Sequence, residues 1–83
     1  MSNVVIYTSA WCPFCLRAKA LLDHKDVSYK EIEAPRGTAA RDEMVKLSNR
    51  NTVPQIFIGE THVGGCDDLF ALEQAGKLDD LLA

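Results

Sequence analysis

The sequence predicts an α/β fold in which a mixed four-stranded sheet is flanked by helices, in the order βαβα–ββα. Three observations support this prediction. Short β-branched apolar segments alternate with segments of helical period along the chain. A Gly-Glu pair at residues 59–60 separates two predicted strands, as in a β-hairpin. A Cys-x-x-Cys motif stands between the first expected strand and the first expected helix.

Length and composition restrict the class of protein. Eighty-three residues are enough for one small domain, residues 1–83. The apolar fraction of 47% and the charged fraction of 25% are ordinary for a globular protein and exclude a disordered chain, collagen and a coiled coil. The net charge of -3 leaves no basic patch for a nucleic acid. No apolar run approaches the roughly 18 residues of a membrane span, and no signal peptide is recognisable, so we expect a cytoplasmic protein.

The first half of the chain is expected to form a parallel strand pair joined by a helix. Residues 4–8 are apolar and β-branched, which suits a buried strand. A loop at residues 9–11 leads to a helix over residues 13–25, with its apolar side chains on one face. Residues 27–33 alternate between apolar and polar side chains, with one slip, and predict a strand near the sheet edge. A right-handed crossover makes the two strands parallel.

The second half is expected to add a helix, a hairpin and two further helices. The Gly64-Gly65 pair breaks the chain after the hairpin, and Cys66 or Asp67 is expected to cap the helix that follows. The predicted elements are a helix at 38–48, strands at 53–58 and 61–63, a helix from 66 or 67 to 76, and a short helix at 78–82.

The Cys12-Pro13-Phe14-Cys15 motif is the most informative feature of the sequence. Pro13 suits the first turn of a helix, so the free N–H groups of the helix start surround the Cys12 sulfur. These groups and the helix dipole favour the thiolate, which is the reactive form of cysteine. Cys15 is expected one turn later, on the inward face of the helix. We therefore expect Cys12 to be the attacking nucleophile and Cys15 the resolving thiol.

Two structural interpretations of the cysteines compete with a redox role. A fixed disulfide is disfavoured because the chain lacks the features of a secreted protein. A zinc site needs four ligands, for which Cys12, Cys15, Cys66 and one of His24 and His62 are available. The sequence contains no second Cys-x-x-Cys and no His-x-x-x-His, so we expect no metal.

Three sequence blocks in order carry a resemblance to a known family. The blocks are Tyr7-Thr8 with Trp11 to Cys15, then Thr52-Val53-Pro54, then Gly64-Gly65-Cys66-Asp67-Asp68. Together they resemble the glutaredoxins, and in particular the small bacterial dithiol glutaredoxins, over nearly the whole chain. The resemblance implies a thioredoxin fold and glutathione as the co-substrate.

The resemblance also implies a glutathione-binding groove beside Cys12. In the family the proline of the Thr-Val-Pro block is cis, and the valine offers its backbone N–H and C=O to the cysteine of glutathione. The N–H groups that follow the glycine pair suit the γ-glutamyl carboxylate, and the side chain of Asp67 suits its amine. The glutathione-binding residues implied in this way are Phe14, Thr52, Val53, Pro54, Gly65, Cys66 and Asp67.

The chain departs from the family pattern around the first cysteine. Ser9 stands where many members have a lysine near the thiolate, and Arg50 and Arg36 are candidates for a replacement cation. Phe14 stands where the family often has tyrosine, and it keeps the ring without the hydroxyl. Trp11 is expected either to cover the site or to pack against the fold.

For three further side chains, the sequence supports only less specific predictions. Cys66 is expected to be a buried, inert thiol or, because it lies beside the groove, a site of oxidation or glutathionylation. His24 and His62 are expected to be solvated rather than catalytic.

The resemblance implies glutathione-dependent thiol–disulfide exchange on glutathionylated and disulfide-containing proteins. We expect a monomer that needs no metal, nucleotide, nucleic acid or membrane. One alternative is a thioredoxin-like redoxin reduced by a flavoprotein reductase. The other is an iron–sulfur carrier, a dimer that bridges a cluster through Cys12 and two glutathiones, which the stiff Pro13 disfavours.

Overall fold

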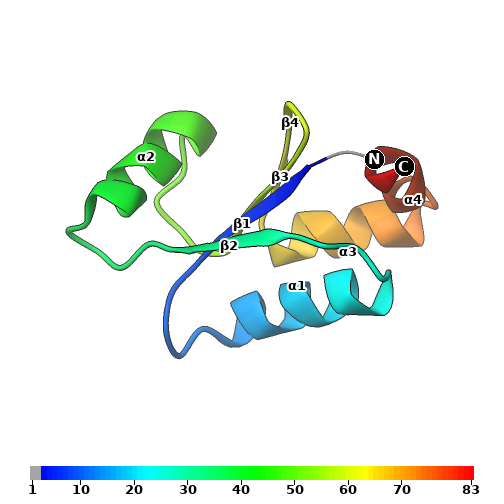
Figure 1. Cartoon of the computed structure of the whole chain (residues 1–83), viewed down its shortest axis with the longest axis horizontal. Helices are drawn as coiled ribbons and strands as arrows, with labels where there is room; N and C mark the ends of the chain where they lie inside the picture. Colours follow the sequence, from blue (N-terminus) through cyan, green and yellow to red (C-terminus); the bar gives the residue numbers. More distant parts are fainter. Residues whose placement is uncertain (1–2) are drawn as a thin grey trace.

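The computed structural model describes residues 3–83 and confirms the predicted order of elements (Figure 1). The elements are β1 (Val4–Thr8), α1 (Pro13–His24), β2 (Lys30–Glu33), α2 (Ala39–Ser48), β3 (Gln55–Ile58), β4 (Thr61–Gly64), α3 (Cys66–Gln74) and α4 (Leu78–Leu82).

The four strands form one mixed sheet in the order β2-β1-β3-β4. β1 pairs in parallel with β2, from Val5 opposite Lys30 to Thr8 opposite Glu33. β1 and β3 are antiparallel, as are β3 and β4 of the hairpin. The parallel pair, the hairpin and the edge position of β2 were all predicted from the sequence, and all are confirmed.

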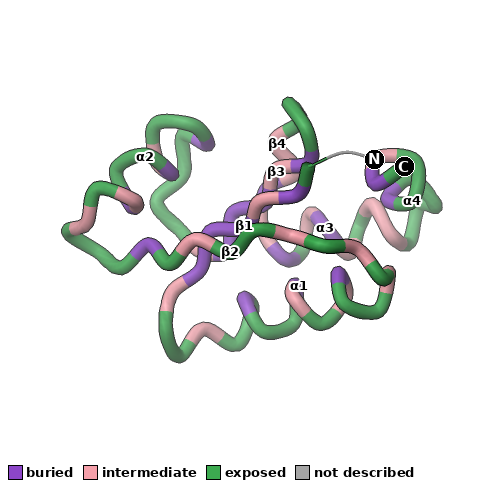
Figure 2. The backbone as a smooth tube through the Cα atoms, viewed as in Figure 1, coloured by how far each residue is buried: buried purple, intermediate pink, exposed green. Residues whose placement is uncertain are grey.

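Helices cover both faces of the sheet, with α1 and α3 on one face and α2 on the other (Figure 1). Alternate side chains of β1 point to opposite faces, as the strand period requires. Val4 and Ile6 pack with Leu22 and Leu69 in the larger core under α1 and α3. Tyr7 packs with residues of α2 in a smaller core on the other face. β1 is therefore buried along most of its length, as Figure 2 shows.

Residues 27–29 do not belong to β2, contrary to the predicted strand at 27–33. The turn that ends α1 extends through residues 25 and 26, because the Lys25 N–H donates to the Leu21 carbonyl at 3.1 Å and Asp26 has a φ of 57°. Val27 and Tyr29 pack against the larger core instead. These two apolar side chains cover the end of α1 and do not extend the sheet.

Two other boundaries differ from the prediction in the region beside Cys12. β3 begins at Gln55, opposite Tyr7, rather than at Val53, since Pro54 has no N–H to donate to a strand ladder. The cap of α3 is Gly65 rather than Cys66 or Asp67. Val53 and Pro54 therefore lie outside the strand ladder, and Cys66 and Asp67 belong to the first turn of α3.

Candidate active site

Cys12 occupies the N-cap of α1, between the end of β1 and the helix that Pro13 begins. Its Sγ accepts a hydrogen bond from the Cys15 N–H at 3.1 Å. The Cys12 thiol also points toward the Val53 carbonyl oxygen, at 3.9 Å. Because Cys12 is only half-buried and lies at a helix N-terminus, its sulfur is accessible and sits where negative charge is favoured.

Cys15 lies on the inward face of α1, as predicted, and only 2% of it is exposed. Burial, followed by the hydrogen bond with Cys12, raises the pKa of Cys15 to about 12. The Ser9 backbone N–H and the charge of Lys19 act in the opposite direction. Cys15 therefore stays protonated at neutral pH while Cys12 faces solvent, and the two thiols of the motif differ sharply in environment.

A groove of about 220 Å³ runs beside Cys12, between the loop before β3 and the start of α3. It brings together segments of the chain that the sequence blocks had marked separately. The Val53–Pro54 peptide bond in its wall is cis, as the family resemblance implied. The residues that line the groove are Phe14, Arg50, Thr52, Val53, Pro54, Gly65, Cys66, Asp67 and Asp68. All seven predicted glutathione-binding residues thus lie along one groove.

The start of α3 is shaped by Asp68 and the two glycines before the helix. The Asp68 Oδ2 atom accepts a hydrogen bond from the Gly65 N–H at 2.9 Å and lies 3.0 Å from Arg50 Nη1. These two contacts, the Gly65 N–H first, hold the pKa of Asp68 below its usual range. Gly64 has a φ of 115°, and a Cβ at that position would overlap the Asp68 carboxylate. Only glycine lets the chain pass this close to the helix start.

Three comparisons with known proteins agree with this geometry. The glutaredoxin family model matches residues 4–63. A glutaredoxin of Pseudomonas aeruginosa is 59% identical, over 100% of this chain and 99% of its own length. The solution structure of a glutaredoxin from Brucella melitensis is 58% identical, with a TM-score of 0.86 over 99% of this chain and 89% of that one. The chain belongs to the glutaredoxin family.

Family membership establishes the activity. The chain is a glutathione-dependent thiol–disulfide oxidoreductase with a thioredoxin-like fold, and both predictions are confirmed. The two alternative functions are not favoured. A buckwheat glutaredoxin–glutathione complex is 32% identical, with a TM-score of 0.87 over 98% of this chain and 76% of that one. No helix among residues 3–83 is long and apolar enough to cross a membrane.

The expectation that Trp11 packs against the fold is wrong, because its side chain is 98% exposed. Trp11 does lie at the cysteine pair, where it lines a cavity with Cys12 and Cys15. Its φ of 59° turns the chain sharply before Cys12 and directs the ring outward. Phe14, in the groove, is also exposed. This glutaredoxin therefore exposes an apolar ring on either side of Cys12 in the sequence.

The third cysteine and the two histidines are placed as follows. Cys66 is buried, as expected, and burial raises the pKa of its thiol. His24 is exposed, as expected. His62 is not simply solvated, since its Nε2 lies 2.7 Å from the Oε1 atom of Gln55. Within residues 3–83, no group of three His, Cys, Asp or Glu side chains is placed to hold a metal ion.

Gln55 is a supporting residue that the sequence analysis missed. It is fully buried, and its Nε2 donates to the Thr52 carbonyl at 3.0 Å and to Thr52 Oγ1 at 3.2 Å. With His62 behind it, Gln55 fixes the loop that forms one wall of the groove. A glutamine at the start of a strand gives no sequence signal for this role.

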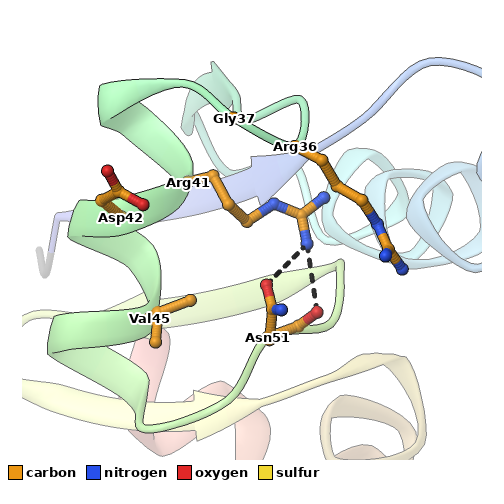
Figure 3. Close-up of a pocket in the computed structure, with 6 residues that line it drawn as sticks. All are labelled: Arg36, Gly37, Arg41, Asp42, Val45 and Asn51. Carbon is orange, nitrogen blue, oxygen red and sulfur yellow. Dashed lines mark hydrogen bonds between the residues drawn. The ribbon is translucent and has the colours of Figure 1, made fainter.

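Arg41 supports the same loop from the other side. This arginine is buried, and its Nε donates to the Ala34 carbonyl at 2.7 Å. Its Nη1 donates to the backbone and side-chain oxygens of Asn51, the residue before the groove wall (Figure 3). Arg36 lines the cavity of about 380 Å³ beside Arg41 rather than the groove, whereas Arg50 does line the groove. Of the two candidate replacement cations, only Arg50 therefore borders the groove.

Proposed function

We propose that Cys12 is the nucleophile, that Cys15 is the resolving thiol, and that the groove beside them holds glutathione. The observation that supports this proposal is the position of Cys12 Sγ against Val53, at one end of a groove lined by every predicted binding residue. A sulfur bonded to Cys12 from the groove side would bring its own backbone alongside Val53.

The groove offers groups that match the two ends of a γ-glutamyl-cysteinyl ligand. Val53 precedes the first paired residue of β3, so its N–H and C=O are not engaged in the sheet and can pair with an extended peptide. The N–H groups of Cys66 and Asp67 open α3 and can receive a carboxylate. The Asp67 carboxylate can pair with the α-amine beside it.

The proposed monothiol reaction has two exchanges. The Cys12 thiolate attacks the glutathione sulfur of a protein–glutathione disulfide. The protein sulfur leaves with the electron pair and takes a proton from solvent, and a Cys12–glutathione disulfide forms. A second glutathione thiolate attacks the glutathione sulfur of this disulfide, which restores the Cys12 thiolate and releases oxidised glutathione.

Protein disulfides are the second proposed substrate class. Trp11 and Leu16 are exposed apolar side chains beside Cys12, and both line a cavity that contains the two cysteines. Such a surface suits a polypeptide with an apolar side chain next to its cysteine. Cys12 would form the mixed disulfide, and Cys15 would resolve it.

The working state we propose is a monomer in the cytoplasm. All seven proposed glutathione-binding residues lie along one groove within a single chain. All three cysteines are free thiols, which suits a reducing compartment.

The test is turnover of a glutathionylated peptide with glutathione, glutathione reductase and NADPH. Cys12→Ser should lower the rate by about a thousandfold or more, because the reacting atom is removed. Cys15→Ser, the matched thiol-to-hydroxyl change one helical turn away, should keep most of the rate. Loss of activity in both variants, or in neither, would contradict the assignment.

A further inference from the structure

A second cavity, of about 380 Å³, also borders the cysteine pair, and we call it the Lys19 cavity. It contains both Cys12 and Cys15, together with Thr8, Lys19 and Glu31. Among the described residues it shares no lining residue with the glutathione groove. Cys12 Sγ lies 3.9 Å from the carbonyl oxygen of Val53 in the wall of the groove, whereas both cysteines line the Lys19 cavity itself.

Lys19 is held in this cavity by a short chain of polar contacts. Its Nζ lies 3.0 Å from the Glu31 Oε2 atom, which also accepts a hydrogen bond from the Thr8 hydroxyl at 2.7 Å. Only 24% of the Lys19 side chain and 34% of the Glu31 side chain are exposed. The Thr8 hydroxyl, followed by Lys19, lowers the pKa of Glu31, and Glu31 raises the pKa of Lys19. Both side chains are therefore charged at neutral pH.

Lys19 stands one helical turn after Cys15, on the same side of α1. It is the cation of the cavity, in which Glu31 and Glu33 are the carboxylates and Cys12 is the other thiol. Its charge favours the thiolate of Cys15, as does the Ser9 backbone N–H. The nearby Tyr29 phenol acts on Lys19 and not on the thiol directly.

The balance of these effects changes during the reaction. In the free enzyme, Cys12 opposes ionisation of Cys15, both through their hydrogen bond and through its charge. Once Cys12 is part of a mixed disulfide, it carries no charge, and this opposition is removed. The stabilising contributions of Lys19 and the Ser9 N–H persist. Ionisation of Cys15 is then favoured at the step that needs it.

We propose that Lys19, held by Glu31, is a positioning residue for Cys15 in the dithiol branch of the reaction. The proposal rests on the roles assigned above to the two cysteines. Cys15 releases its proton to solvent entering the cavity, and its thiolate attacks Cys12. The Cys12–Cys15 disulfide forms, and the bond from Cys12 to the substrate sulfur breaks. That sulfur leaves with the electron pair and takes a proton from solvent.

Lys19 has the same role when glutathione reduces the enzyme. A glutathione thiolate attacks Cys12, the Cys12–Cys15 bond breaks, and Cys15 leaves with the electron pair. Both the attacking and the leaving ability of a thiol depend on how well its thiolate is stabilised. Removal of the cation should therefore slow each step by about 3- to 10-fold.

The experiment compares two rates in Lys19→Met. The first is the single-turnover release of glutathione from protein glutathionylated at Cys12, which requires Cys15. The second is glutathione-dependent turnover in a Cys15→Ser background, which does not. Lys19→Met should lower the ratio of the first rate to the second by about 3- to 10-fold between pH 7 and 9. High salt should shrink the effect, because Lys19 is partly exposed.

Two variants serve as controls. Lys19→Arg keeps the cation and should restore most of the ratio. Lys25→Met removes a lysine at the other end of α1 that pairs with Glu73 and Asp79 and does not line the cavity. An equal ratio in Lys19→Met and Lys25→Met would overturn the proposal. If wild-type protein glutathionylated at Cys12 releases no glutathione, the assigned roles of the cysteines fail instead.

Discussion

The two sites beside the cysteine pair, the groove and the Lys19 cavity, differ in which parts of the chain form them. The proposed glutathione groove is formed mainly by two short runs of consecutive residues, 52–54 and 65–68, whose backbone path sets its shape. The Lys19 cavity is built from side chains that reach across from three elements, with Thr8 on β1, Lys19 on α1 and Glu31 on β2. A backbone site depends on the few residues that set the path of the chain. A side-chain site depends on the particular groups that meet there.

The two sides nevertheless use the same electrostatic arrangement. In each site, one carboxylate accepts a hydrogen bond from a neutral donor and also pairs with a cation. Asp68 is held by the Gly65 N–H and Arg50, and Glu31 is held by the Thr8 hydroxyl and Lys19. In the groove the carboxylate fixes a helix start. In the cavity it fixes a cation next to a buried thiol.

The largest expected effect follows from the backbone nature of the groove. Gly64→Ala should cost about 2 to 4 kcal/mol of unfolding free energy, because the new Cβ overlaps the Asp68 carboxylate and the φ of 115° disfavours a side chain. It should also raise the KM for glutathione. Urea denaturation measures the first effect, and steady-state kinetics the second.

Gly76→Ala is the matched control for this change. Gly76 also has a positive φ, of 72°, but a Cβ there would meet no described atom within 4 Å. Backbone strain alone should cost about 1 to 2 kcal/mol. Equal losses in the two variants would show that the contact with Asp68 is unimportant.

A smaller loss of stability is expected when Asp68 beside the groove or Glu31 in the Lys19 cavity is replaced by its neutral amide. The pKa values of Asp68 and Glu31 are lowered in the folded protein, so each carboxylate stabilises the fold above its unfolded pKa and loses this contribution as pH falls. Asp68→Asn and Glu31→Gln should each lower Tm by a few degrees at pH 7, since both side chains are partly exposed.

The pH dependence provides the check on that prediction. The Tm difference from wild type should narrow toward pH 3, where the wild-type carboxylates become protonated. Thermal unfolding followed by circular dichroism from pH 7 to 3 measures it. A difference that stays constant over this range would mean that the contacts act through packing and not through charge. Asp68→Asn should also raise the KM for glutathione more than Glu31→Gln does.

The smallest effect on stability is expected for Trp11→Ala. Because the side chain is almost fully exposed, unfolding free energy should change by less than about 0.5 kcal/mol. Turnover of glutathionylated peptides with an apolar residue beside the cysteine should fall a few-fold relative to a small glutathionylated thiol. Leu47→Ala, at an exposed leucine that lines neither the groove nor the Lys19 cavity, is the control. Similar losses for both substrates would argue against a peptide-binding role.

The difference between the two sides explains how much could be read from the sequence. The groove was predictable because a backbone site needs particular residues in short runs, such as Thr52-Val53-Pro54 and the glycine pair. The element order and the unequal burial of Cys12 and Cys15 were predictable for a similar reason, since strand and helix periods are local. Each of these signals lies within a few consecutive residues.

The rest depends on contacts between residues distant in sequence. Lys19 and Glu31 are twelve positions apart, and nothing local shows that β2 places the carboxylate beside α1. Gln55 and Arg41 fix the groove wall through buried hydrogen bonds that no motif announces. The start of β2 was misplaced because Val27 and Tyr29 alternate like a strand but pack against the larger core.

The side on which glutathione binds is the central claim, and NMR of a trapped mixed disulfide tests it most directly. Cys15→Ser protein treated with oxidised glutathione would carry glutathione on Cys12. Apart from residues adjacent to Cys12, backbone amide shifts relative to the reduced variant should concentrate at Thr52, Val53 and residues 65–68. Shifts concentrated instead at Leu16, Lys19 and Glu31 would place glutathione in the Lys19 cavity and contradict the account.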